Sequence, residues 1–157
     1  MNDQEYMYRV RSMEARLYRI AQAILWRHSD CSDAVQEAVF RGWLKKNSLR
    51  EMDFFETWLI RILINECKDQ LKRRGREGQP FLLEIAAEDH MCDDLHLRMA
   101  LKRLPEKYRL PLVLHYLEGF SVKEVAGMLG LTPTRVNTRL SQGRKNLRIL
   151  LDGGAKE

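Results

Sequence analysis

The stretch Phe120–Leu151, FSVKEVAGMLGLTPTRVNTRLSQGRKNLRILL, decides the fold of the C-terminal part of this 157-residue chain. Ser121 is placed to cap a first helix, and Glu124 stands at the capping-box position three residues later. Gly130 follows as a tight turn. Thr132-Pro133 then opens a second helix, because threonine is a good cap and proline is favoured at the first helical position. Two capped helices joined by a glycine turn predict a helix-turn-helix.

The second of these helices has two distinct faces. Its inward face is mostly apolar and consists of Val136, Leu140, Gly143, Leu147 and Leu150. The helical period places the polar residues on the opposite face: Thr134, Asn137, Thr138, Ser141, Gln142 and Lys145. Hydroxyls and amides both donate and accept hydrogen bonds at base edges in a major groove. Flanking basic side chains suit phosphates, namely Arg135, Arg139, Arg144, Lys145 and Arg148. A solvated basic helix is the alternative, but the capped pair favours DNA binding.

The net charge of +5 is unevenly distributed along the chain. Residues 1–74 hold 14 basic and 11 acidic residues, a net +3, and residues 95–157 hold 12 and 5, a net +7. Between them, residues 75–94 hold 1 basic and 6 acidic residues, a net −5, and open with glycines and a proline. Such a segment is typical of a linker. We therefore predict two small domains, 1–74 and 95–157, joined by a flexible acidic linker over 75–94.

Helical periodicity dominates both basic blocks, and no sustained period-two alternation occurs, so we predict an all-α fold. In the first block the apolar spacing at 17–25 and the capping residues at 31–33 predict two helices. A third helix is expected at 54–74, with an apolar face of Phe55, Trp58, Leu59, Ile62, Leu63, Cys67 and Leu71. In the second block we expect helices at 95–104 and 106–118, with Pro111 as a possible site of kinking in the latter.

Three groups of residues in the first block are candidate binding residues. Arg61, Asn65, Lys68 and Lys72 recur at helical spacing and could follow a nucleic-acid backbone, with Trp58 available to stack on a base, although core packing of the aromatic residues is favoured. The polar loop at 46–53, with Asn47, Ser48 and Arg50, could hold an extruded base. An acidic and aromatic helix surface could dock a protein, or could simply be an amphipathic helix: Asp33, Gln36, Glu37, Phe40 and Arg41.

Several other classes of protein are disfavoured. No P-loop, GxSxG or HExxH motif is present, so we predict that the chain is not an enzyme and needs no cofactor. Cys31, Cys67 and Cys92 stand far apart, and we expect reduced thiols rather than disulfides or a metal site. No apolar run approaches a membrane span, and residues 1–11 do not resemble a signal peptide, so we expect a cytoplasmic location without membrane insertion. The chain ends soon after Leu151, and we expect no further regulatory domain there.

Four motifs in order resemble the sigma factors of bacterial RNA polymerase, specifically the extracytoplasmic function (ECF, group IV) class of the sigma-70 family. The first is the run 33–43, DAVQEAVFRGW, and the second is the run 55–65, FETWLIRILIN. The third combines 104–109, LPEKYR, with 112–116, LVLHY, and the fourth is the helix-turn-helix itself. The chain departs from the family pattern at 132–135 and 137–138, so the resemblance does not imply a promoter sequence.

The resemblance implies a role for each group of residues. The acidic and aromatic group on the 33–43 run would bind the coiled coil of the polymerase's largest-subunit clamp, and the second domain would contact the flap. The 46–53 loop and the 58–72 strip would read and melt the minus-ten element. The outward face of the last helix would read the minus-thirty-five element, and the linker would pass through the polymerase channels. An anti-sigma factor is a further implied partner.

The resemblance therefore predicts a factor that binds core RNA polymerase and directs transcription from specific promoters. A stand-alone helix-turn-helix repressor or activator is the main alternative, although it would leave the first block without a role. A sigma-like adaptor that binds polymerase without reading promoters is a third interpretation.

Overall fold

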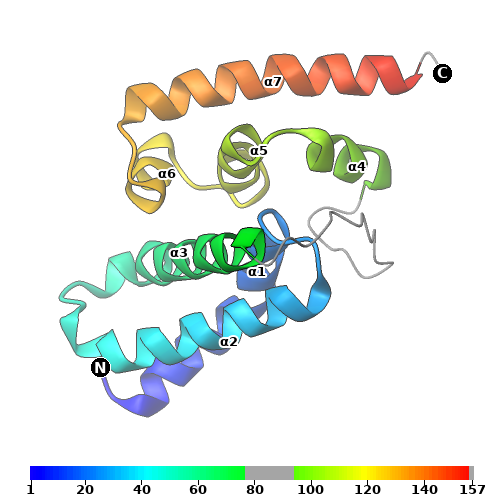
Figure 1. The fold of residues 1–157 in the computed structure, drawn as a ribbon. Coiled ribbons are helices and arrows are strands. Elements are labelled where there is room, and N and C mark those ends of the chain that lie inside the picture. The colour runs from blue at the N-terminus through cyan, green and yellow to red at the C-terminus, as the bar shows by residue number, and fades with distance from the viewer. Residues whose placement is uncertain (77–93, 156–157) are drawn as a thin grey trace. The chain divides into compact units, whose positions relative to one another are not determined.

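The computed structural model describes residues 1–76 and 94–155, and within these ranges every regular element is helical and no strand is present (Figure 1). The predicted all-α fold is confirmed. The chain divides into two compact units, Met1–Asp89 and His90–Glu157. The predicted linker over 75–94 lies almost entirely outside the described residues, so its flexibility stays a prediction.

The N-terminal unit is built from three long helices that pack against one another (Figure 1). They are α1 (Asp3–Gln22), α2 (His28–Lys45) and α3 (Phe55–Arg76), with two short turns, η1 (Lys46–Ser48) and η2 (Met52–Phe54), between the last two. The Asn2 side chain caps α1 by accepting from the Glu5 amide at 2.8 Å. The second helix begins at His28, three residues before the expected capping residues, and Arg27 at its N-cap provides no side-chain bond.

The core face of α3 differs from the expected one. Ile60 and Ile64 are fully buried, whereas Trp58, Ile62 and Leu71 are only half-buried. Four of the seven expected residues are buried, so the prediction was wrong only for Trp58, Ile62 and Leu71, and it omitted Ile60 and Ile64. The reason is that α3 packs against both α1 and α2, so its buried surface is wider than a single stripe and is turned toward Ile60.

A glycine allows α1, α2 and α3 to approach closely. A Cβ atom at Gly42 on α2 would overlap the hydroxyl of Tyr6 from α1 and would lie 3.0 Å from a methyl carbon of Leu59 on α3. The Tyr6 hydroxyl donates to the Val39 carbonyl at 2.6 Å. Burial of this phenol raises its pKa to about 12. The absence of a side chain at position 42 is thus a packing requirement of the N-terminal unit.

The C-terminal unit places one long helix against shorter ones. The helices are α4 (Leu95–Arg103), α5 (Glu106–Leu112), η3 (Val113–Leu117), α6 (Val122–Leu129) and α7 (Pro133–Ala155), and α7 packs on α4, α5 and α6 (Figure 1). Arg109 is buried, and it donates to the Leu104 carbonyl at 2.7 Å, across the turn between α4 and α5. Burial lowers the pKa of this guanidinium.

The helix expected at 106–118 changes its winding after residue 112. Pro111 lies inside α5, and the next turn, η3, is a π-helix. The Glu118 amide bonds to the Val113 carbonyl at 2.9 Å, which is the five-residue spacing of that wider turn. Proline has no amide to donate, so the regular bonding pattern is interrupted where the winding changes.

The helix-turn-helix has the capping interactions predicted from its sequence. The Glu124 amide bonds to the Ser121 hydroxyl at 3.1 Å, and the Glu124 carboxylate accepts from the Ser121 amide at 3.0 Å. Gly130 has φ +67°, the left-handed conformation that favours glycine. The Thr132 hydroxyl accepts from the Arg135 amide at 3.2 Å, which caps α7. Val136 and Leu140 are buried, as expected, whereas Leu147 and Leu150 are half-buried.

Candidate nucleic-acid interface and docking face

The predicted base-reading residues lie along one side of α7. Helical geometry places positions 134, 137, 138, 141, 142 and 145 on a common face, and all six residues are exposed. The Gln142 amide donates to the Asn146 carbonyl oxygen at 3.0 Å, and the Thr138 hydroxyl donates to the Thr134 backbone carbonyl at 3.0 Å. Within residues 1–76 and 94–155, no hydrogen-bond or ionic partner is seen for the side chains of Asn137, Ser141 and Lys145. Such a face can meet base edges without first breaking a strong internal bond.

The flanking basic residues of α7 differ in their surroundings. Arg135 is exposed and Arg139 is half-buried beside the polar face. Arg144 instead donates to the Tyr116 hydroxyl at 2.7 Å, with its guanidinium carbon 6.0 Å from the centre of that ring. It also lines an apolar groove with leucines of α4, α5 and α7. Sequence reasoning placed all three arginines on phosphates, whereas Arg144 has an internal partner on η3.

The predicted strip on α3 is a continuous surface. Arg61, Asn65 and Lys72 are exposed and Lys68 is half-exposed, and their spacing places them on one side of the helix. Trp58 lies one turn before Arg61 on the border of this strip, half-buried, and its ring centre is 5.8 Å from that of Phe55. The indole therefore combines a core contact with an exposed edge beside basic residues.

The predicted base-holding loop is short and partly wound into η1 and η2. Asn47, Ser48 and Arg50 are all exposed, and the Ser48 hydroxyl donates to the Lys45 carbonyl at 2.6 Å. On its N-terminal side the loop adjoins a cluster of side chains that joins α1 to the end of α2.

This cluster is centred on Asp3. Its carboxylate accepts from the indole nitrogen of Trp43 at 2.9 Å and pairs with the Lys46 ammonium at 3.2 Å. The Lys46 ammonium also lies 5.1 Å from the centre of the Trp43 ring. The hydrogen bond from Trp43 and then that from Lys46 lower the pKa of Asp3. The first turn of α1 thus contacts the residue at which the loop begins.

The predicted docking face occupies one side of α2. Asp33, Gln36 and Phe40 are exposed, and Glu37 and Arg41 are half-buried. The sequence reasoning did not include Trp43 and Leu44, which extend this surface. The Phe40 and Trp43 rings stack at 6.3 Å between centres, and Leu44 is 61% exposed. An exposed apolar group of this kind, edged by carboxylates, has the composition of a protein-binding surface.

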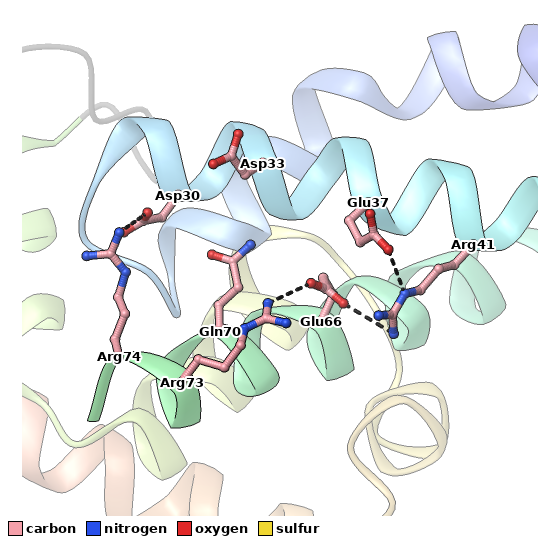
Figure 2. Close-up of a pocket in the computed structure, with 8 residues that line it drawn as sticks. All are labelled: Asp30, Asp33, Glu37, Arg41, Glu66, Gln70, Arg73 and Arg74. Atoms are coloured by element: carbon pink, nitrogen blue, oxygen red, sulfur yellow. Dashed lines mark hydrogen bonds and ion pairs between the residues drawn. The ribbon is translucent and has the colours of Figure 1, made fainter. Parts of the chain in front are cut away.

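A polar groove lies beside the docking face, between α2 and α3, and Figure 2 shows side chains from both helices pointing into it. The Glu37 carboxylate accepts from Arg41 at 3.0 Å, and Asp30 pairs with Arg74. Glu66 of α3 is buried in the groove and pairs with Arg41 at 3.3 Å and with Arg73 at 3.2 Å (Figure 2).

Sequence reasoning did not single out Glu66. A signal for it existed, because Glu66 stands three residues after Leu63 and seven after Leu59 and therefore lies on the apolar stripe of α3. A carboxylate at a buried helical position requires a partner, and the structure supplies two arginines.

Residues 1–76 and 94–155 contain no group of three or more histidine, cysteine or acidic side chains placed to hold a metal ion. In the same part of the chain, no helix is both long enough and apolar enough to cross a membrane.

Two family models match the chain, one in each unit. The model for sigma-70 region 2 matches residues 9–77, and the model for sigma-70 region 4 matches residues 95–147. The first match covers the docking face and the α3 strip, and the second covers most of α7.

Curated relatives match over most of the chain. The chain is 32% identical to the ECF RNA polymerase sigma factor SigE of Mycolicibacterium smegmatis, over 90% of this chain and 60% of the relative. It therefore spans less than two thirds of that relative. It is 30% identical to the RNA polymerase sigma factor SigV of Bacillus subtilis, over 85% and 83%. It is 27% identical to SigW of the same organism, an ECF RNA polymerase sigma factor, over 85% and 81%.

Solved structures show the same fold. The sigma factor RpoE of Bartonella quintana, in complex with the anti-sigma factor NepR, has a TM-score of 0.84 at 26% identity, over 95% of this chain and 98% of that one. CnrH, in complex with the cytosolic domain of CnrY, has a TM-score of 0.73 at 26% identity, over 97% and 90%. On these motifs, surfaces and matches, the chain belongs to the ECF class of the sigma-70 family of RNA polymerase sigma factors.

Proposed function

We propose that this protein binds core RNA polymerase and directs initiation at promoters that it selects itself. The observation that carries the proposal is the pairing of two kinds of surface in one chain. A helix-turn-helix displays an exposed polar face on α7, and the other unit displays both an acidic and aromatic docking face on α2 and a basic strip on α3. A repressor needs only the first of these surfaces.

Each surface has a defined task in the proposal. The α2 face, with Asp33, Phe40 and Arg41 among its residues, binds the clamp coiled coil of the polymerase. The strip that includes Arg61 and Asn65, with the loop before it, contacts the minus-ten element. The polar face of α7 reads the minus-thirty-five element, while its unit contacts the flap. The chain itself carries out no catalysis, because the polymerase forms the RNA. Initiation at the promoter DNA takes place in the cytoplasm.

The domain division supports this plan. We propose that residues 1–74 and 95–157 act as two separate binding domains, with 75–94 as the tether between them. The two family models match residues 9–77 and 95–147, and the compact units divide within the segment that lies between the two matches. Two domains on a tether can contact two promoter elements and the polymerase together, which increases the effective concentration of each contact.

We also propose that an anti-sigma factor controls the protein. The sigma factor RpoE of Bartonella quintana, which covers nearly the whole chain in the structural comparison, was solved in complex with the anti-sigma factor NepR. Co-purification of the tagged chain from its native cell tests this, and a bound protein that blocks transcription in a purified system is the expected result.

Run-off transcription tests the main function. Purified chain, core RNA polymerase and a library of promoter fragments should yield transcripts from a defined subset of fragments, and core enzyme alone should not. Tight binding to operator DNA by the isolated chain, with no polymerase-dependent transcript, would favour the repressor. Binding to polymerase without any promoter preference would favour the adaptor.

A further inference from the structure

Glu66 is a carboxylate that lies beneath the docking face. Its side chain is 2% exposed and comes from α3, whereas the docking face belongs to α2. Arg41, the docking residue that it contacts, is 25 positions away along the chain. Glu66 is therefore brought to this face by the packing of α2 on α3.

Arg41 is held from two sides. Its Nε donates to Glu37 Oε1 at 3.0 Å, and its Nη1 lies 3.3 Å from Glu66 Oε2 (Figure 2). Glu37 is on the same helix and 44% exposed, so solvent competes for that bond. Glu66 is shielded from solvent and fixed in the helix interface. Glu37 therefore supplies the directional hydrogen bond, whereas Glu66 supplies a solvent-shielded charge that keeps the guanidinium at this place against the helix interface.

The Glu66 carboxylate also has a second contact. Its other oxygen pairs with Arg73 at 3.2 Å, and Oε2 accepts no hydrogen bond of good geometry within the described residues. If Arg41 were lost, the buried Glu66 carboxylate would keep only its ion pair with Arg73, whose side chain is 58% exposed. The arrangement favours keeping Arg41 at this place rather than letting it turn out into solvent.

A fixed arginine binds a partner better than a mobile one. An arginine side chain loses considerable rotamer freedom when it is ordered on binding, and ordering it beforehand removes that loss from the binding step. The Arg41 side chain is 42% exposed, so Glu66 contacts it on its buried side while the other side stays accessible to a partner.

We propose that Glu66 is a positioning residue for polymerase binding: through its shielded charge it keeps the Arg41 guanidinium at the place where this group meets the polymerase. The inference rests on the proposed function, because it assumes that the α2 face binds polymerase. It assigns to Glu66 an effect on affinity that acts through Arg41 and is absent when Arg41 is absent.

The test is a double-mutant cycle on the affinity of the full chain for core RNA polymerase. Glu66→Gln keeps the size of the side chain and removes its charge, and Arg41→Ala removes the positioned group. We expect each single variant to bind about ten-fold more weakly, and the double variant to bind no more weakly than Arg41→Ala alone, since coupled residues give non-additive losses. Additive losses, or normal affinity of Glu66→Gln beside a weak Arg41→Ala, would overturn the inference.

Three further variants keep the test independent of folding. Glu56→Gln removes a carboxylate from the same helix that pairs with Arg16 at 2.8 Å, and it should leave polymerase affinity unchanged. Arg41→Lys leaves Glu66 intact but lacks the separate nitrogens with which the guanidinium meets Glu37 and Glu66, so it should lose affinity, and adding Glu66→Gln to it should change little. Binding is measured below the unfolding temperature of every variant, as determined by circular dichroism.

Phe40→Ala separates failure of the inference from failure of the proposed function. Phe40 is 53% exposed on the docking face and has no contact with Glu66 among those described. Weak binding by Phe40→Ala with normal binding by Glu66→Gln overturns only the role of Glu66. Normal binding by both Phe40→Ala and Arg41→Ala would show that the docking face does not bind polymerase, and the inference would fall with it.

Discussion

The two units present their functional residues in different ways. In the C-terminal unit the predicted base-reading residues follow one another along a single helix, and local caps at Ser121 and Thr132 fix where the helices begin. In the N-terminal unit the candidate surfaces are divided between α2 and α3, and long-range ion pairs such as Asp30–Arg74 and Arg41–Glu66 connect the two helices. Residues on a single helix are aligned as soon as that helix forms. Residues on two helices are aligned only when the two helices also pack against each other in the native arrangement.

This difference makes the N-terminal unit more sensitive to changes between its helices. The two tightly packed glycines allow a direct comparison. Gly42→Ala would place a methyl group against Leu59 and the buried Tyr6 hydroxyl, and the tyrosine cannot move away without losing its hydrogen bond to the Val39 carbonyl. We expect a loss of about 2 kcal/mol in the free energy of unfolding, typical of overpacking. All three tryptophans lie in this unit, so denaturant unfolding followed by tryptophan fluorescence measures it.

Gly143→Ala is the matched control in the other unit. The added Cβ would lie 3.1 Å from a Leu112 methyl carbon, which is the end of a flexible side chain, and alanine gains about 1 kcal/mol in helix propensity. We expect a change within about 1 kcal/mol, measured by circular dichroism. Equal losses for the two glycine variants would contradict the contrast between the units.

The polar face of α7 should respond in specificity rather than stability. Asn137→Ala removes an exposed amide without a partner within the described residues, so the fold should be unchanged. A base contact of this kind contributes about 1–3 kcal/mol of discrimination, and we expect about ten-fold weaker preference at one minus-thirty-five position. Transcription from a library randomised in that element measures it. Uniform losses across all sequences would mean that Asn137 does not read a base.

Tyr6→Phe tests the α1–α2 contact without altering its shape. Loss of the 2.6 Å hydrogen bond to the Val39 carbonyl should lower the free energy of unfolding by about 1 kcal/mol at neutral pH. The pKa of Tyr6 is raised to about 12. As the pH rises from about 10 toward 12, the unfolded chain loses the phenol proton before the native chain does, so stability falls in the wild type.

The variant has no phenol at this position, so its stability should fall less over the same pH range. Urea unfolding of both proteins at pH 9 and pH 11 measures the difference. Parallel pH profiles would show that the Tyr6 phenol ionises as readily in the native state as in the unfolded chain.

The smallest expected effect concerns Arg144. Because it donates to the Tyr116 hydroxyl, Tyr116→Phe should release the guanidinium while keeping the ring. We expect the free energy of promoter binding to change by less than about 0.5 kcal/mol. The slope of the logarithm of the binding constant against the logarithm of the salt concentration should change by less than about one, the value for a single phosphate contact. Lys145→Ala is the comparison, and it should reduce the magnitude of this slope by about one, because it removes one phosphate contact. A larger effect from Tyr116→Phe would mean that the bound position of Arg144 matters for DNA contact.

The contrast between the units also explains what could be predicted from the sequence. The capping box, the tight turn at Gly130 and the buried side of the helix with Val136 and Leu140 depend on neighbours within a few residues, and all were predicted correctly. The rotation of α3 toward Ile60 depends on two partner helices, and local periodicity could not resolve it. The Arg144–Tyr116 bond and the two arginines around Glu66 likewise depend on tertiary packing.

The motifs of α2 and α3 were nevertheless assigned to the right family, because family resemblance does not require knowledge of the interface. The stretch 33–43 was identified without its contact to Glu66, and the part that Trp43 and Leu44 play in the exposed surface became visible only in the structure. The sequence alone could not show which side chains of α2 and α3 form ion pairs with each other.

The close contact at Gly143 has a consequence for how promoter preference can change. With Leu112 and the Cβ of Tyr108 within 3.4 Å of where a Cβ atom would stand, α7 lies close against α5, with Val136 and Leu140 of the same helix side buried. Turning the helix to present a new set of side chains would bring these apolar residues out of the core. Divergence of such a factor toward new target genes must therefore proceed by replacing individual outward residues, one base contact at a time, while the rest of the unit is retained.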